Sequence, residues 1–137
     1  MKKFVTLCLL SVAVISWITP TAQALAPFKK AFQQKYVDDG DDALKAAFKK
    51  ASCNTCHVKG KKKDERNTYG DELAKLIEGD AQSRIKAAGK NGAEARKAET
   101  QKILAELDKA LDEVAKKDAV DGTYGERIKA GKLPVDP

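Results

Sequence analysis

Three features of the sequence predict an all-α fold. Apolar side chains recur every three or four residues through most of the chain, which is the spacing of one helical face. No segment alternates between apolar and polar residues over the length of a strand, and no internal repeat is present. Clusters of Gly, Asp and Asn separate the helical segments and predict turns between them.

The first two predicted helices precede Cys53. Aromatic side chains recur every four residues on one face of the first: Phe28, Phe32 and Tyr36. A turn over residues 38–41 follows, where Asp41 or Asp42 can cap the next helix. The apolar residues of that second helix form one stripe leading directly to the cysteine: Leu44, Ala47, Phe48 and Ala51. Cys53 is therefore expected at the C-terminal end of a helix.

A basic, polar loop is predicted over residues 60–66, followed by two short helices. The first begins near Asn67 and Thr68, whose side-chain oxygens can accept backbone N–H groups, and it ends near Gly79. Its apolar face comprises Leu73, Leu76 and Ile77. The second is expected over residues 81–88, before the glycines of residues 89–92.

A long helix is predicted over residues 93–117. Its apolar residues are spaced three, four and three apart: Leu104, Leu107, Leu111 and Val114. Two pairs at i,i+4 are expected to support its exposed face: Asp112 with Lys116, and Glu113 with Lys117. One more helical turn is expected within residues 123–128.

The N-terminus has the features of a secretory signal peptide. Lys2 and Lys3 precede an apolar run of about 15 residues, which is shorter than the roughly 20 that span a bilayer. Cleavage is predicted after Ala24. The alternatives are an uncleaved anchor and cleavage after Ala26, which Pro27 disfavours. The predicted organisation is a signal peptide over 1–24 and a single domain over 25–137, exported to the periplasm or beyond, without stable membrane insertion after cleavage.

The predicted mature chain is small, basic and poor in large apolar side chains. It has 113 residues, enough for one domain, and its formal net charge falls from +6 to about +4 once Lys2 and Lys3 are removed. This charge favours acidic docking surfaces on protein partners, and export argues against nucleic acid as a partner. A buried cofactor would help to fill a core that the side chains fill poorly.

The cysteines are the strongest functional signal. Of the three cysteines, Cys8 lies in the predicted signal peptide, which leaves Cys53 and Cys56 with His57 directly after them. Two thiols on one helical turn can each add to a vinyl group of a porphyrin, and the next imidazole can bind the iron. The motif therefore predicts one covalently attached haem c, with His57 as the iron ligand.

Three other interpretations of the motif are less consistent with its context. A thioredoxin-type dithiol lies at the start of a helix after a strand, whereas this pair is predicted at a helix end. A zinc site needs more strong ligands than these three residues supply. A disulfide across two residues would constrain very little of the chain.

The helix that ends at residues 53–57, the basic loop, the short helix and the long C-terminal helix resemble the class I cytochrome c fold. This resemblance covers most of the mature chain and implies that Phe48 crosses the stripe of Leu104, Leu107 and Leu111 beside the haem. Residues 53–70, with the tail 128–134, are similar to small monohaem cytochromes of planctomycete type on shorter stretches.

The second axial ligand departs from that family. Class I cytochromes c use a methionine, but the only methionine is Met1, and His57 is the only histidine. The open alternatives are water or an empty position, a lysine, a tyrosinate from Tyr69 or Tyr124, and the N-terminal amine or a partner's ligand. Tyr69 is also a candidate for haem binding through its ring or through a hydrogen bond to a propionate. Loss of the thioether predicts a lower reduction potential.

The predicted function is electron transfer by a monohaem cytochrome. No arrangement of catalytic acid, base or nucleophile is visible, so an enzyme is not predicted. The alternative is a haem-based sensor or scavenger of nitric oxide or carbon monoxide, and a third is a subunit of a larger haem complex. The cytochromes c′ bind such gases, but their attachment motif lies near the end of the chain, whereas about 80 residues follow it here.

Overall fold

The computed structural model describes residues 26–136, so the predicted signal peptide over 1–24 lies outside the described residues. The described chain is mostly helical, which confirms the all-α prediction, and its extended residues are limited to a short β-ribbon and an isolated bridge between His57 and Arg66. None of its helices is long and apolar enough to cross a membrane. The elements are, in order, α1 (Ala26–Phe32), a π-helical turn (Gln33–Val37), α2 (Asp42–Ala51), a 3-10 turn (Ser52–Thr55), α3 (Thr68–Leu76), α4 (Ala81–Gly89), α5 (Ala93–Val114), β1 (Asp118–Ala119), β2 (Gly122–Thr123) and α6 (Tyr124–Lys129).

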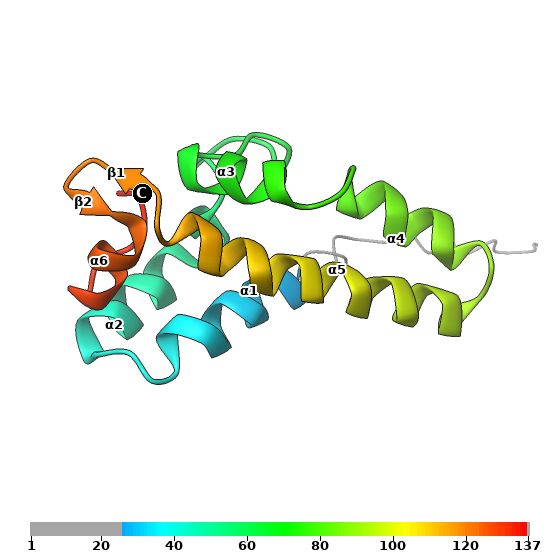
Figure 1. Cartoon of the computed structure of the whole chain (residues 1–137), viewed down its shortest axis with the longest axis horizontal. Helices are drawn as coiled ribbons and strands as arrows, with labels where there is room; N and C mark the ends of the chain where they lie inside the picture. Colours follow the sequence, from blue (N-terminus) through cyan, green and yellow to red (C-terminus); the bar gives the residue numbers. More distant parts are fainter. Residues whose placement is uncertain (1–25, 137) are drawn as a thin grey trace, which may run out of the picture.

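The long helix α5 organises the molecule. Figure 1 shows α4 running alongside its N-terminal half as one arm of a helical hairpin, while α1 and α3 lie on different sides of its C-terminal half. The ribbon, α6 and α2 gather at the far end of α5. The predicted order of helices is therefore correct.

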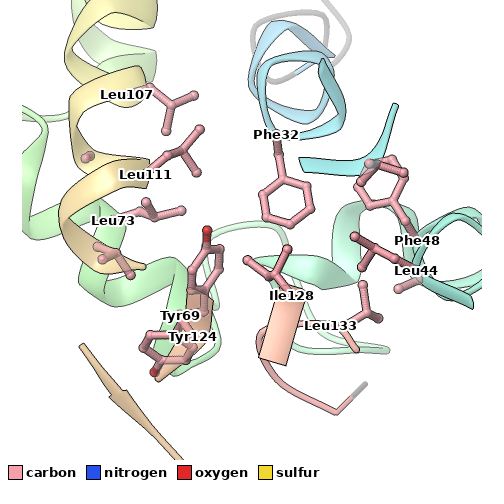
Figure 2. Packing of buried hydrophobic residues seen from close by; sticks show 14 residues of the cluster. Phe32, Leu44, Phe48, Tyr69, Leu73, Leu107, Leu111, Tyr124, Ile128 and Leu133 are labelled. Atoms are coloured by element: carbon pink, nitrogen blue, oxygen red, sulfur yellow. The ribbon is translucent and has the colours of Figure 1, made fainter. Parts of the chain in front are cut away.

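The main hydrophobic core lies where α1, α2, α3, α5 and α6 meet (Figure 2). Phe32 is its central aromatic side chain, because its ring stacks on Phe48 at 5.5 Å and meets Tyr36 edge-on at 5.2 Å between centroids. The predicted stripes supply most of the remaining core: Leu44, Ala51, Leu73, Leu107, Leu111 and Val114. Leu76 was predicted to be buried, but it is 42% exposed because α3 ends there.

The capping residues explain where several helices begin. Asp41 accepts a hydrogen bond from the Leu44 backbone N–H at 2.7 Å, which decides between the two predicted caps of α2. Asp80 caps α4 by accepting from Ser83 N–H at 2.8 Å. Thr123 caps α6 in a capping box, so the expected C-terminal helical turn forms.

The predicted charge pairs within α5 are wrong. Asp112 binds Lys35 of the π-helical turn at 2.9 Å, and Lys117 binds Glu72 of α3. Lys116 pairs with Glu113 at 2.9 Å, three residues away rather than four. Because α1 and α3 pack against this half of α5, they offer tertiary partners that compete with the i,i+4 pairs.

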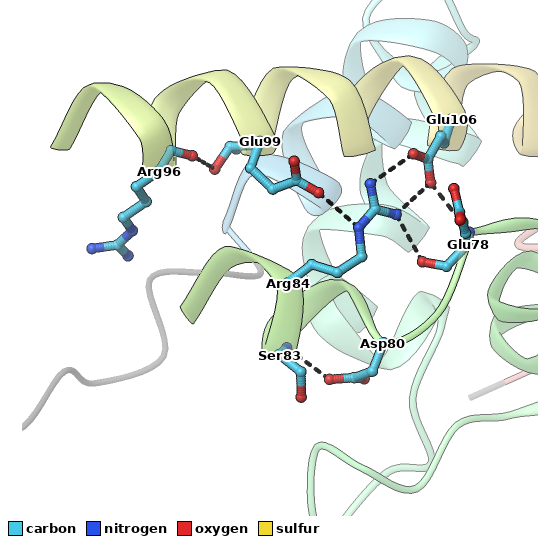
Figure 3. A network of polar contacts seen from close by, with 8 residues as sticks. Glu78, Asp80, Ser83, Arg84, Arg96, Glu99 and Glu106 are labelled. Carbon is cyan, nitrogen blue, oxygen red and sulfur yellow. Dashed lines mark hydrogen bonds and ion pairs between the residues drawn. The ribbon is translucent and has the colours of Figure 1, made fainter. Parts of the chain in front are cut away.

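A partly buried arginine joins α4 to α5 (Figure 3). Arg84 donates from Nε to Glu99 at 2.7 Å and in bidentate fashion to Glu106 at 2.7 and 2.8 Å. It also donates to the Glu78 carbonyl at 2.7 Å. Ile85 of α4 and Ile103 of α5 are both buried, and neither belongs to the main core. The hairpin is thus held by one ion-pair cluster and buries one apolar side chain from each helix.

The helix that carries Phe48 does not make the expected crossing of α5. Instead α1 packs along α5, and Phe48 stacks on Phe32 of α1. The aromatic face of α1 packs on the leucine stripe of α5, in the place that was expected for the helix that carries Phe48. This aspect of the resemblance to class I cytochromes c is therefore wrong.

Candidate functional site

The Cys53–His57 segment forms a tight turn immediately after α2. Ser52 ends α2 with a φ of 52°, a backbone region that residues other than glycine rarely adopt. In the turn that follows, the backbone N–H groups of Cys56 and His57 both donate to the Cys53 carbonyl at 3.2 Å. The two thiols and the imidazole thus lie on one compact turn at a helix end, as the sequence predicted.

Asn67 holds this turn from the other side. Its side-chain amide donates to the carbonyls of Asn54 at 3.2 Å and Thr55 at 3.1 Å, and its backbone N–H donates to the Cys56 carbonyl at 3.1 Å. Its Oδ1 accepts from Gly70 N–H at 2.9 Å and caps α3. The sequence predicted only the cap. The connection to the cysteine turn depends on a tertiary contact that no local pattern reports.

His57 lies where the chain runs antiparallel to the end of the basic loop. It forms an isolated β-bridge with Arg66, and Val58 N–H donates to the Glu65 carbonyl at 3.0 Å. Burial is the main cause that lowers the pKa of His57, and the positive charges of Lys63 and Arg66 act in the same direction, while the Glu65 backbone opposes them. The imidazole therefore favours its neutral form, which is the form that binds metals.

The Nδ1 atom of His57 is buried and makes no hydrogen bond of normal geometry within the described residues. The Glu65 backbone lies close enough to raise the pKa of His57, against the larger effect of burial. A metal-bound histidine usually donates its second ring N–H to such a carbonyl, which fixes the tautomer.

The two cysteines differ in their surroundings. Both are free thiols, and Cys53 is exposed whereas Cys56 is largely enclosed. Burial, with a smaller effect of Cys53, raises the pKa of Cys56 to about 12. At neutral pH Cys56 is therefore mainly in its protonated form.

A cavity of about 380 Å³ opens beside the cysteine turn. Cys53, Cys56 and His57 line one part of it, and most of the remaining wall is apolar. The apolar wall is supplied by α1, α2, α3 and α5: Phe28, Phe32, Phe48, Leu73, Ala74, Ile77, Leu107 and Leu111. Ligand pockets commonly have this size and this mixture of apolar walls and a few polar groups.

Tyr69 stands behind this cavity rather than on its wall. It is 0% exposed, and its ring packs edge-on against Phe32 at 6.0 Å and Tyr124 at 5.1 Å. Its hydroxyl is buried without a hydrogen-bond partner in the described chain, and Figure 2 shows the oxygen pointing between Phe32 and Leu111, which both line the cavity. Burial raises the pKa of Tyr69 well above its usual value. Tyr69 is thus a neutral hydroxyl that points towards the cavity.

The sequence identified Cys53, Cys56 and His57, and the structure brings these three together on the cavity. It did not identify the contribution of α1, from which Phe28 and Phe32 form a wall. The four-residue spacing of the aromatics was visible in the sequence, but it indicated only a helical face and not what that face covers.

A second hollow, of about 570 Å³, lies at the opposite end of the molecule, where α4 turns into α5. Gly89, Gly92, Arg96, Lys97 and Thr100 are among its lining residues, and no cysteine, histidine or carboxylate lines it. The residues of the cysteine turn therefore line the first cavity and not this second hollow.

Comparisons of the chain with protein-family models, with curated proteins and with solved structures found no match.

Proposed function

We propose that this chain is an exported monohaem c-type cytochrome that transfers electrons in the periplasm. The observation that carries the proposal is the position of Cys53, Cys56 and His57 together on the wall of an apolar cavity. The donor set fits haem c, because it offers two thiols for the vinyl groups and one imidazole, in its neutral form, for the iron. A cytochrome c-like arrangement of helices around the haem is part of the same proposal.

In this proposal each residue of the motif has a distinct role. Cys53 and Cys56 would hold the haem through thioether bonds, each formed by addition of S–H across one vinyl group so that no atom is lost. His57 would hold the iron through its imidazole. The haem, when bound, supplies the one-electron chemistry, and the protein supplies orientation and an environment of low polarity.

The surface around the exposed end of the site supports an electron carrier. Cys53 is exposed, and the neighbouring loop presents a run of exposed lysines: Lys59, Lys61, Lys62 and Lys63. A positive surface around one accessible edge attracts acidic partners and accelerates brief encounters. The proposed partners are therefore redox proteins with acidic docking surfaces.

Covalent attachment is tested by secretion of the protein in a host with haem-maturation machinery, followed by denaturation and mass spectrometry. We expect a chain heavier by one haem, and loss of that mass in the double variant Cys53→Ala, Cys56→Ala. A colourless wild-type chain with only its polypeptide mass would overturn the proposal.

Electron transfer is tested with two oxidants of opposite charge, ferricyanide and tris(phenanthroline)cobalt(III). The reduced protein should react faster with ferricyanide as salt is lowered, and Lys61→Ala, Lys62→Ala, Lys63→Ala should weaken that dependence. The matched control replaces Lys86, Lys90 and Lys97, three exposed lysines of the α4–α5 hairpin, and so removes the same charge. Equal salt dependence in both sets of variants would contradict a docking role for the loop.

The absence of a methionine ligand favours a second candidate function, reversible binding of nitric oxide or carbon monoxide. That function requires an open position on the iron. A high-spin optical spectrum that changes at once on addition of nitric oxide would support it over the electron carrier.

A further inference from the structure

Few side chains on the cavity wall could bind iron opposite His57. Apart from the cysteine turn, the strong donors that line the cavity are Lys29, Lys63, Asp64 and Asp80. Neither Tyr69 nor Tyr124 is among the lining residues, and both are buried in the aromatic cluster. The tyrosinate alternative is therefore less favourable than an amine or a carboxylate from the wall.

Lys63 and Asp64 lie on the same side as His57. They belong to the loop whose end pairs with His57 through the bridge to Arg66. An axial ligand opposite His57 has to come from a different wall, because the two ligands approach the iron from opposite faces of the porphyrin.

Asp80 is already engaged in the fold. Its carboxylate accepts from Ser83 N–H at 2.8 Å and caps α4, and the hydrogen bonds from Ser83 lower its pKa. Withdrawal of the carboxylate to bind iron would leave the first turn of α4 without its cap, at a cost of about 1 kcal/mol.

Lys29 comes from the wall formed by α1. That wall consists of Ala26, Phe28, Lys29 and Phe32, and Lys29 is the only one of these four with a donor atom on its side chain. Figure 2 shows Phe32 of α1 facing Leu73 of α3 and Leu107 of α5 across the interior, and all three residues line the cavity, so the α1 wall that carries Lys29 is separate from the wall formed by α3 and α5. The Lys29 ammonium lies 5.8 Å from the centroid of the Phe48 ring, another lining residue.

We infer that Lys29 supplies the second axial ligand to the haem iron. This inference rests on the proposed function. In the haem-bearing protein its ammonium would release one proton to solvent, and the nitrogen lone pair would bind the iron in place of a water molecule. Within residues 26–136 the amine would give up only its weak contact with Phe48, and the flexible stem of lysine would allow the movement. A nitrogen ligand in place of a thioether agrees with the lower reduction potential that the sequence predicts.

The test is the optical and electron paramagnetic resonance spectrum of the ferric haem-bearing protein and of two variants. Lys29→Ala removes the proposed ligand. Lys30→Ala is the matched control, because Lys30 is the exposed neighbour on α1 and does not line the cavity. We expect low-spin spectra for the wild type and Lys30→Ala, and conversion to high-spin with new binding of carbon monoxide after reduction in Lys29→Ala.

Two results would overturn the inference: a high-spin wild type, or a low-spin spectrum that Lys29→Ala leaves unchanged. The latter would point to the N-terminal amine or a partner's side chain. Lys29→Met gives a second measurement, since a thioether at this position should raise the midpoint potential above that of the wild type. Each of these results is obtained on protein whose mass shows attached haem, so they overturn Lys29 ligation alone. A secreted chain without haem would overturn the proposed function as well.

Discussion

Gly70 lies directly against the backbone of Cys56, so that a Cβ atom at position 70 would stand 2.1 Å from the Cys56 carbonyl oxygen. No side chain fits there without displacement of the cysteine turn. We therefore expect Gly70→Ala to lower the free energy of unfolding by about 2 kcal/mol or more. Urea denaturation followed by circular dichroism measures the change.

Gly89 provides the control for this substitution. It ends α4, and a Cβ there would meet the Arg96 side chain at 3.6 Å, an ordinary contact. Gly89→Ala should leave stability unchanged or raise it by up to about 1 kcal/mol. Identical midpoints for the two alanine variants would show that the contact between Gly70 and Cys56 is looser than the structure indicates.

The amide donor of Asn67, which binds the cysteine turn, is expected to contribute more to stability than the Asn67 oxygen that caps α3. Asn67→Asp keeps the oxygen that accepts from Gly70 but removes the donors to Asn54 and Thr55 and places a negative charge near their carbonyls. We expect a loss of about 2 kcal/mol, measured by urea denaturation, and a smaller fraction of secreted chains with haem. Asp80→Asn, which keeps a capping oxygen on α4, should change neither quantity appreciably. A stable, fully loaded Asn67→Asp protein would contradict this role.

The hydroxyls of two tyrosines should behave differently. Tyr36 donates to the Leu111 carbonyl at 2.8 Å, so Tyr36→Phe should cost about 1 kcal/mol and leave the haem spectrum unchanged. The Tyr69 hydroxyl has no partner in the described protein and points towards the cavity. Tyr69→Phe should therefore shift the haem spectrum or midpoint potential. A variant that is more stable and spectrally identical would show that Tyr69 serves only in packing.

Acid should loosen the α4–α5 hairpin through Glu106. Its hydrogen bonds with Arg84 lower the pKa of Glu106 in the folded state, so its contribution to stability is present above the ordinary carboxyl pKa and is lost as the pH falls through the lowered value. Between about pH 5 and pH 3, the free energy of unfolding should fall by roughly 1 kcal/mol more in the wild type than in Glu106→Gln.

Glu113→Gln is the control for that acid effect, because Glu113 forms an exposed pair with Lys116. The thermal midpoint measured as a function of pH distinguishes the variants. If Glu106→Gln follows the wild-type curve at every pH, the ion-pair cluster around Arg84 does not make the stability of the hairpin depend on acid.

The helices could be predicted because local signals agree with the fold. The stripe of Leu44 and Phe48 and the capping oxygens of Asp41 and Asn67 act within one or two turns, and the structure follows them. The partners of α5 could not be predicted in the same way. Lys117 reaches Glu72 rather than Glu113, because α3 packs against α5 and brings an acidic side chain closer than a helical turn does.

In the candidate site, too, local features could be predicted from the sequence and tertiary contacts could not. Cys53, Cys56 and His57 could be identified because their spacing along the chain carries the chemistry by itself. The wall from α1 could not, because Phe32 lies far from the motif in sequence and reaches the cavity only through the packing of α1 on α5. The need for glycine at position 70 could not be predicted from the sequence either, because it comes from the close approach of the Cys56 backbone and not from the helical conformation of Gly70 itself.

If haem is attached as proposed, the enclosed Cys56 has a consequence for the maturation of the protein. Burial raises the pKa of the Cys56 thiol to about 12, so little thiolate forms at neutral pH, and haem attachment at that sulfur is expected to be slower in the closed fold than in an open chain. Under the proposed function, the bonds to the porphyrin form while the newly exported chain is still open. The helices then close around a haem that is already covalently attached, so folding is the last step of assembly and does not have to precede attachment.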